Sequence, residues 1–260
     1  MNGAAERLPP VLIGIAILAI WEISVRALGV PPYVLPGPLL ILQTLWADAP
    51  LLLRSLRTTL EITFTALALA ALGGVALAFL MTLSRWLERS LMPYAVIAQV
   101  TPIVAIAPLI IIWINDPFLS LVACAWIVAF FPILANTIAG IRGADRNLRD
   151  LFRLYGARRW QVQYLLEGPS ALPYFLVGLR ISGGLALIGA VVAEFVAGSG
   201  GTATGLAFRI LEAGYRLQIP RLFAALVLLS TAGIAIHAVL GALSSYVLSR
   251  WYGGSDRNES

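Results

Sequence analysis

The chain has 260 residues, of which 60% are hydrophobic and only 12% charged, and its mean hydropathy is +0.88. Because a soluble domain carries about 25% charged residues, this composition excludes an ordinary soluble fold. The net charge is +5, and all 18 strongly basic residues are arginines. These arginines lie between apolar blocks, which argues against nucleic-acid binding. A single cysteine, Cys124, and a single histidine, His237, exclude an intrachain disulfide and argue against a zinc site.

Six apolar stretches are long enough to cross a bilayer as α-helices, each of which needs roughly 20 residues. We expect spans at 9–28, 58–83, 93–114, 118–138, 174–197 and 222–248. The sequence therefore predicts an all-α fold, a polytopic membrane helix bundle with about six transmembrane helices. We expect a single transmembrane domain over 1–260, with its core at 58–250.

The region before the second span is predicted to hold one membrane helix and one surface helix. No small-residue cleavage site follows the first apolar stretch, so we expect it to be retained as a span. Within it, Glu22 and Arg26 are four residues apart and are expected to pair on one helix face. The proline-rich segment 30–38 cannot be a central helix, and 39–57 is predicted to be a short amphipathic helix at the membrane surface.

Prolines interrupt the third and fourth predicted spans. Pro102 and Pro108 are expected to break the third span beside a solute pathway, because irregular backbone at membrane depth is tolerated where it lines a cavity. In the fourth span, Pro132 and Asn136 predict a kink, and an ordinary interhelical hydrogen bond from Asn136 is the alternative.

The distribution of arginine predicts that both chain termini lie in the cytoplasm. This orientation also places the arginines between the fourth and fifth spans on the cytoplasmic side. They are Arg142, Arg146, Arg149, Arg153, Arg158 and Arg159. The opposite orientation would leave this whole group outside the cell, so we reject it.

The segment 142–173 is the longest polar part of the chain and is predicted to form two short helices. Asp145 suits a helix N-cap and Gly156 a left-handed C-cap, and between them apolar side chains recur at helical spacing. A second helix, 158–166, is expected to end before Pro169. The residues leave two interpretations open, a hairpin on the membrane surface that binds anionic headgroups and a docking element for a cytoplasmic partner.

The same segment resembles the EAA loop of bacterial ATP-binding-cassette (ABC) importer permeases, whose pattern is Glu-Ala-Ala, three residues, Gly, nine residues, Ile, any residue and Leu-Pro. Here Asp150-Leu151-Phe152 stands at the Glu-Ala-Ala, Gly156 at the glycine, Leu166 at the Ile and Gly168-Pro169 at the Leu-Pro. The resemblance implies that this loop seats in a groove of an ATPase subunit. The coupling residues that it implies are Asp150, Leu151, Phe152, Tyr155, Gly156, Trp160, Leu166 and Pro169.

Further segments extend the resemblance over most of the chain. The segments 31–38, 130–140 and 178–194 look like the nitrate/sulfonate/taurine branch of these permeases. The resemblance implies a type I importer fold in a bacterial inner membrane, assembled as a permease homodimer with two ATPase subunits and an external solute-binding protein. It leaves the solute open among nitrate, sulfonates, taurine and vitamin-like aromatics such as pyrimidines and riboflavin.

The chain is expected to have no ATPase activity of its own. A Walker phosphate loop ends in Gly-Lys-Ser/Thr, and the sequence contains no lysine. We therefore expect a subunit that is not an enzyme and needs no cofactor, with ATP hydrolysed on another polypeptide.

Ionisable residues inside the predicted spans are candidates for the solute pathway, because a charge in hydrocarbon is costly. Glu194 is expected either to line the outer end of the pathway or to cap a neighbouring helix. Arg180 is expected to extend toward the cytoplasmic interface, and His237 to be an interior histidine, with a proton relay as the less favoured role. The predicted pathway residues are Pro102, Pro108, Asn136 and Glu194. The glycine-rich outer segment 198–220 is a candidate gate or docking surface for the binding protein.

Two other functions are compatible with about six spans. A secondary transporter driven by an ion gradient usually contains internal repeats, and none is found in this sequence. An intramembrane serine protease of the rhomboid type would need a Ser-His pair, but Ser199 and His237 are expected to differ in depth by roughly 20 Å. Both remain alternatives to the importer.

Overall fold

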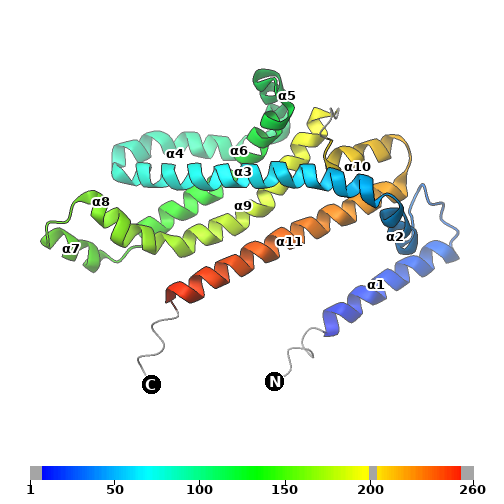
Figure 1. Ribbon diagram of the computed structural model, residues 1–260, viewed down its shortest axis with the longest axis horizontal. Helices are drawn as coiled ribbons and strands as arrows, with labels where there is room; N and C mark the ends of the chain where they lie inside the picture. Colours follow the sequence, from blue (N-terminus) through cyan, green and yellow to red (C-terminus); the bar gives the residue numbers. More distant parts are fainter. Residues whose placement is uncertain (1–7, 199–203, 253–260) are drawn as a thin grey trace.

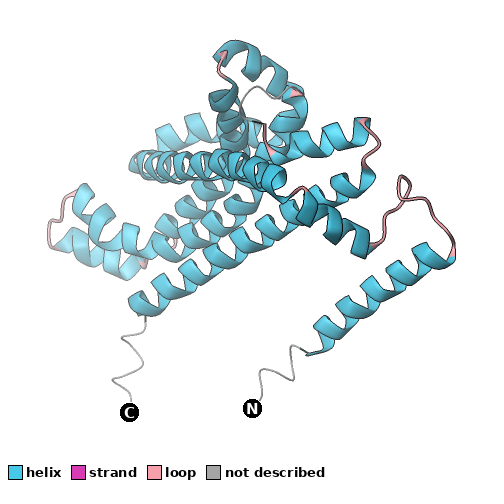
Figure 2. Ribbon diagram, turned by 45° about the vertical axis from the view of Figure 1, so that its right-hand side comes forward, coloured by secondary structure: helices cyan, strands magenta, loops and turns pink. Residues whose placement is uncertain are grey.

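The structure is a computed structural model that describes residues 8–198 and 204–252. Within these residues the chain folds into helices joined by turns and short loops (Figure 2). The helices are α1 Leu8–Ala27, α2 Pro38–Ala47, α3 Ala49–Leu83, α4 Arg85–Val100, α5 Ile103–Ile114, α6 Pro117–Arg142, α7 Arg146–Leu154, α8 Arg159–Val162, the π-helical turn η1 Gln163–Glu167, α9 Gly168–Ala197, α10 Leu206–Tyr215 and α11 Ile219–Tyr252.

Long helices run the length of the molecule, with α6 packed against α3 and α9, and α11 packed against α9 (Figure 1). The short helices α7 and α8 lie at one end of this bundle, and α2 and α10 lie at the other end. The short helices therefore lie at two ends of the bundle that are separated by membrane-length helices.

Four helical stretches of the described residues are long and apolar enough to cross a membrane: α3, α6, α11 and the continuous stretch Arg159–Ala197, which includes α8, η1 and α9. The pair α4 and α5 passes the same test only together and is bent by 103°, as in a broken span or a re-entrant loop. The all-α membrane bundle is thus confirmed, with these four spans and the bent pair carrying the core.

The third predicted span, 93–114, is wrong as a single helix, because the chain bends between α4 and α5. Thr101 is extended (φ −72°, ψ 123°), as expected for a residue that precedes a proline, and Pro102 has no N–H to continue the helix. Pro108 lies inside α5 and does not end it. Of the two prolines, only Pro102 breaks the backbone.

The predicted surface helix at 39–57 is also wrong, because two helices divide this segment. α2 ends at Ala47, and α3 begins at Ala49 and continues for 35 residues through the whole second predicted span. Pro50 explains the division, since its ring would clash with the carbonyl of the preceding turn inside a helix but is tolerated in the first turn of a new one.

The fifth span begins earlier than the expected residue 174, and the helix 158–166 does not end before Pro169. Instead α8 passes through the π-helical turn η1 directly into α9. The wider winding of the turn accommodates Pro169, which lies in the first turn of α9. A rigid helix therefore connects the α8 end of the molecule to the membrane core.

Helices α6 and α9 approach each other closely because glycine stands at three contact points. A Cβ at Gly140 would lie 2.7 Å from the Cα of Ala171, at Gly178 it would lie 2.9 Å from the carbonyl oxygen of Pro132, and at Gly189 2.9 Å from the Cα of Ala125. Small residues favour helix association in membranes, where burial from water supplies no driving force. This seam is the centre of the fold.

Helix α1 has the length of the predicted first span but lies apart from the bundle in both ribbon views (Figures 1 and 2). It contacts α2, and the ring of Trp21 lies 6.1 Å from the ring of Phe223 in α11. Most of its described apolar side chains are exposed, as expected for a helix that meets lipid or another protein chain. Its role as the first span stays a prediction.

Candidate functional site

Helix α7 is bounded by the two caps that the sequence predicts. The Asp145 carboxylate accepts a hydrogen bond from the Asn147 N–H at 2.7 Å, which confirms the N-cap. Gly156 has φ +67°, and the Ala157 N–H donates to the Phe152 carbonyl at 2.9 Å, so the helix ends in a Schellman motif. The reversal of the chain between α7 and α8 thus depends on a left-handed glycine.

The described side chains of α7 and α8 are mostly exposed. The exposed fraction is 85% for Leu154, 83% for Tyr155 and 60% for Trp160. Single chains rarely leave several large apolar side chains in water, so this end of the molecule is suited to a partner or to lipid.

Among the predicted coupling residues, the structure separates exposed positions from buried ones. Asp150 is exposed and pairs with Arg153 at 3.1 Å, and Leu151 is also exposed, whereas Phe152 is half-buried. Leu166 is buried beneath the loop and is not available to a partner.

Trp160 and Pro169 line an apolar groove of about 1020 Å³ that extends to Phe79 of α3 and to Trp251 near the end of α11. The groove brings together residues from three separate parts of the sequence, and Tyr164 lies in its wall as well. The accessible residues among the predicted coupling residues therefore lie on α7 and α8 and along this groove.

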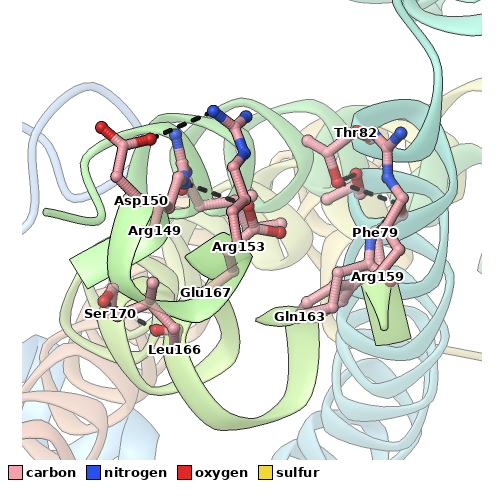
Figure 3. A network of polar contacts seen from close by, with 12 residues as sticks. Phe79, Thr82, Arg149, Asp150, Arg153, Arg159, Gln163, Leu166, Glu167 and Ser170 are labelled. Atoms are coloured by element: carbon pink, nitrogen blue, oxygen red, sulfur yellow. Dashed lines mark hydrogen bonds and ion pairs between the residues drawn. The ribbon is translucent and has the colours of Figure 1, made fainter. Parts of the chain in front are cut away.

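Polar contacts connect the loop to the long helices (Figure 3). The Arg149 guanidinium donates to the Ile141 carbonyl at the end of α6 and lies 3.2 Å from Glu167 in an ion pair. Arg159 donates to the Thr82 carbonyl of α3 at 2.9 Å, and Gln163 donates to the Phe79 carbonyl at 3.3 Å. Because these contacts reach α3 and α6, a force on α7 or α8 is transmitted to more than one span.

At the other end of the bundle, Glu194 is buried in the last turns of α9 and caps α10. Its carboxylate accepts hydrogen bonds from the Thr59 hydroxyl at 2.7 Å and from the Ala207 N–H at 2.9 Å. Gly205 makes room for it, since a Cβ there would overlap the carboxylate group. Of the two roles expected for Glu194, this geometry supports the helix cap.

The four predicted pathway residues do not form one cluster. Asn136 donates to the Pro132 carbonyl of its own helix at 2.8 Å and lies against Gly178 of α9. Gly178 and Glu194 are 16 residues apart on α9, which corresponds to roughly 24 Å along the axis. Among the described residues Asn136 makes no interhelical hydrogen bond, so its alternative role is not supported.

An arginine and a histidine meet in the middle of the spans, a contact that the sequence alone does not predict. The Arg180 guanidinium of α9 lies 2.7 Å from Nε2 of His237 in α11, and both side chains are exposed in the single chain. Arg180 therefore contacts a neighbouring helix. The signal available in the sequence was the presence of two basic side chains at similar depth.

Arginine contacts also organise the segment that includes α10. Arg221 holds Asp48 at 2.6 and 3.1 Å, and Arg209 donates to Ser55, Thr204 and Glu212. These bonds tie α10 and the start of α11 to α2 and α3. Ser199, the other half of the protease alternative, lies outside the described residues.

Within residues 8–198 and 204–252, no group of three His, Cys, Asp or Glu side chains is placed to hold a metal ion.

The chain is similar to known transport proteins over nearly its whole length. Residues 70–252 match the family model described as "Binding-protein-dependent transport system inner membrane component". The formylaminopyrimidine transport permease protein ThiX of Halalkalibacterium halodurans is 35% identical over 249 residues, which cover 95% of this chain and 98% of the relative. The riboflavin transport system permease protein RibX of Chloroflexus aurantiacus is 35% identical over 245 residues, or 90% of this chain and 87% of the relative.

The fold is also found among solved structures. An inward-facing structure of the MetNI methionine ABC transporter has a TM-score of 0.67 at 18% identity, covering 77% of this chain and 98% of that chain. At this identity the likeness concerns the fold.

Proposed function

Because the chain belongs to the family of binding-protein-dependent transport system inner membrane components, it is the membrane-spanning permease subunit of an ABC importer, and we propose that α7 and α8 are the surface through which a separate ATPase subunit drives it. The observation that carries this proposal is the pair of exposed helices reversed at Gly156 and bonded to the ends of α3 and α6. The coupling contact consists of Asp150, Leu151, Tyr155, Gly156, Trp160 and Pro169, with Phe152 and Leu166 packed behind it.

The mechanism follows from the rigidity of these connections. When ATPase subunits close, a force on α8 passes through η1 into α9, because the three form one continuous helical stretch. A force on α7 passes through Arg149 to Ile141 of α6 and to Glu167. Because α6 and α9 pack closely at their glycines, they then move as one body. Closure of the ATPase subunits thus becomes a rocking of the helix bundle, which opens the solute pathway to one side of the membrane at a time.

The assembly contains a second permease copy in this proposal. One copy supplies too few spans to enclose an aqueous pathway, and Arg180 and His237 are exposed at mid-span, where a guanidinium facing lipid is costly. We place this pair at the interface between two copies, against the solute pathway. Both chain termini are cytoplasmic, on the side of α7 and α8, as the arginine distribution predicts.

The opposite end of the bundle faces the external solute-binding protein. Here Glu194 of α9 caps α10, and Arg209 of α10 donates a hydrogen bond to Ser55 of α3, so a force on α10 reaches the spans directly. A small nitrogen heteroaromatic compound is the favoured solute class, because the two relatives at 35% identity are named for formylaminopyrimidine and riboflavin transport. Nitrate, sulfonates and taurine are the other candidates.

Reconstitution with the ATPase subunits and the loaded binding protein tests the coupling role. Asp150→Arg is expected to abolish uptake and the stimulation of ATP hydrolysis while the protein still inserts. The double variant Asp150→Arg with Arg153→Asp restores the ion pair within α7 but not the contact to a partner, so it should remain inactive. Normal stimulation in the single variant, or recovery in the double variant, would refute the coupling role.

A further inference from the structure

The inner side of the α7–α8 loop faces a basic cavity, and Arg149 and Arg159, which bond the loop to the spans, belong to its lining. The cavity has a volume of about 700 Å³ and lies between the end of α3, helix α4, the end of α6 and the loop. Its charged lining consists of Arg85, Glu88, Arg89, Arg142, Arg149, Arg153, Arg159 and Glu167. We call this space, lined by these residues, the basic cavity.

Arginine is in clear excess in the basic cavity. Six arginines minus two glutamates leave a net charge of +4. Each glutamate has a partner, Glu88 with Arg142 and Glu167 with Arg149. Among the described residues, no hydrogen bond or ion pair is formed by the side chains of Arg85 and Arg89. Arg153 pairs with Asp150 outside this lining, so the unpaired positive charge lies on the exposed Arg85, Arg89 and Arg159, where it favours an anion.

Arg149 adds an independent indication. Its Nε atom is buried and lies within ion-pair distance of Glu167, but it has no hydrogen-bond partner among the described residues. A buried donor without a hydrogen bond is costly. An acceptor oxygen brought into the cavity would remove that cost.

The position of the cavity indicates where the anion comes from. The membrane-length helix α3 ends at Leu83, and Arg85, Trp86 and Arg89 follow within two turns. Trp86 is 74% exposed and Tyr94, further along α4, is 70% exposed. Aromatic residues and arginines at the end of a span are typical of headgroup depth, so the cavity lies where lipid phosphates are concentrated.

We propose that the basic cavity binds the phosphate of an anionic membrane lipid and thereby joins the α7–α8 loop to α4 and α6. The inference rests on the cytoplasmic placement of the loop in the proposed function. A phosphate presents several acceptor oxygens to the guanidinium groups, and Met92 and Ile141 supply an apolar wall for the start of the lipid chains. Anionic lipids of the cytoplasmic leaflet favour such basic sites between membrane helices.

Binding would stiffen the connection through which the loop acts. Arg149, Arg153 and Arg159 belong to the loop, whereas Arg85 and Arg89 belong to α4 and Arg142 to α6. A shared anion between these groups holds the loop against the spans. Without it, the arginines repel one another and a push on α8 is transmitted less completely. The two interpretations of the loop then apply to its two sides, the exposed side for the ATPase and the inner side for headgroups.

The test compares two single variants in the purified importer complex. Arg89→Gln removes a charge from the basic cavity, and Arg250→Gln removes one from the same leaflet outside it. Retention of phosphatidylglycerol or cardiolipin is measured by native mass spectrometry. Affinity should fall roughly fivefold for Arg89→Gln and roughly thirtyfold for Arg85→Gln combined with Arg89→Gln, since each arginine near an anionic surface contributes about 1 kcal/mol. Arg250→Gln should be nearly unchanged.

ATP hydrolysis in nanodiscs supplies the second readout. Phosphatidylglycerol should raise stimulated hydrolysis above that in phosphatidylcholine alone, and the rise should be lost in Arg89→Gln but not in Arg250→Gln. Equal effects of both variants would overturn the proposal, as would full replacement of the lipid by inorganic phosphate. Loss of ATPase-subunit binding by Arg89→Gln in phosphatidylcholine alone would assign the cavity to a protein carboxylate. Lipid retention does not require coupling, so its result is separate from that of the Asp150 variants.

Discussion

The hydroxyl of Thr59 donates a hydrogen bond of 2.7 Å to the carboxylate of Glu194, and the same hydroxyl accepts one of 2.8 Å from the Leu206 N–H. The carboxylate in turn accepts the Ala207 N–H, so α3 and α9 together satisfy the first turn of α10. Ordinary caps come from the residue before a helix, but here the N-cap is Gly205, which has no side chain. Two distant helices supply the cap instead.

Helix α2 is also capped by a side chain from another helix. Glu22 of α1 accepts the Leu39 N–H at 3.1 Å, and the N-cap Gly37 leaves the space, since a Cβ there would lie 2.6 Å from the carboxylate oxygen. The predicted pair of Glu22 with Arg26 is confirmed at 2.6 Å. A glutamate from a longer helix, α1 or α9, thus fixes each of the short helices α2 and α10.

Glu194→Ala is expected to destabilise the permease. The substitution leaves the Ala207 N–H buried without its acceptor, at a cost of about 1–3 kcal/mol, and leaves the Thr59 hydroxyl with only the longer bond of 3.3 Å to the Ser55 carbonyl. The melting temperature of the purified complex should fall by several degrees. Glu61→Ala, which removes an exposed glutamate paired with Arg57, is the control and should change it little. Equal melting temperatures would contradict the buried cap.

Gly178→Ala should weaken the contact of α6 with α9. Its Cβ would approach the Pro132 carbonyl oxygen to 2.9 Å and the Cβ of Asn136 to 3.1 Å, and backbone cannot yield as a flexible side chain does. We expect about 1–3 kcal/mol of destabilisation, seen as a lower melting temperature. A Cβ at Gly184 on the same helix would have no atom of the described chain within 4 Å, so Gly184→Ala should be neutral or slightly stabilising. The seam would be in doubt if both variants behaved alike.

Substitutions at Gly156 should affect coupling in the order of their tolerance for a left-handed backbone. Its φ is +67°, and no atom of the described residues lies within 4 Å of the position that a Cβ would take, so backbone strain and not crowding decides the outcome. Gly156→Asn should retain most uptake, Gly156→Ala less and Gly156→Val least, because asparagine visits this region most readily and β-branched residues least. Solute uptake and stimulated ATP hydrolysis are the measurements, and a different order would contradict the strain argument.

Cysteine labelling should show that Arg180 and His237 face water in the assembled importer. In a Cys124→Ser background, His237→Cys is expected to react with a charged thiol reagent. Val239→Cys, two residues further on the opposite face of α11 and exposed in the single chain, is expected to face lipid and remain unlabelled. Labelling measured by mass shift distinguishes the two, and an unreactive His237→Cys would remove the pair from the pathway.

Much of the membrane fold follows from the sequence alone. The length of the apolar stretches predicts spans that coincide with α3, α6, α9 and α11, because the thickness of a bilayer sets the length of a helix that crosses it. The caps of α7 are equally local, since Asp145 and Gly156 act on backbone within a few residues. The EAA-like spacing indicates the loop, and the family match confirms the class of protein.

Only the tertiary structure decided which polar residues meet. Glu194 is a cap because α10 folds back onto it across 13 residues of sequence and meets Thr59, which is 135 residues away from Glu194. Arg180 contacts His237, which is 57 residues away in the sequence. The arginines of α4 line the same cavity as those of the loop, which also lie far away in the sequence. Periodicity and capping rules act over a few residues, so they determine where helices lie. Contacts between helices depend on how α6 and α9 close at their glycines, and that packing brings the functional groups together.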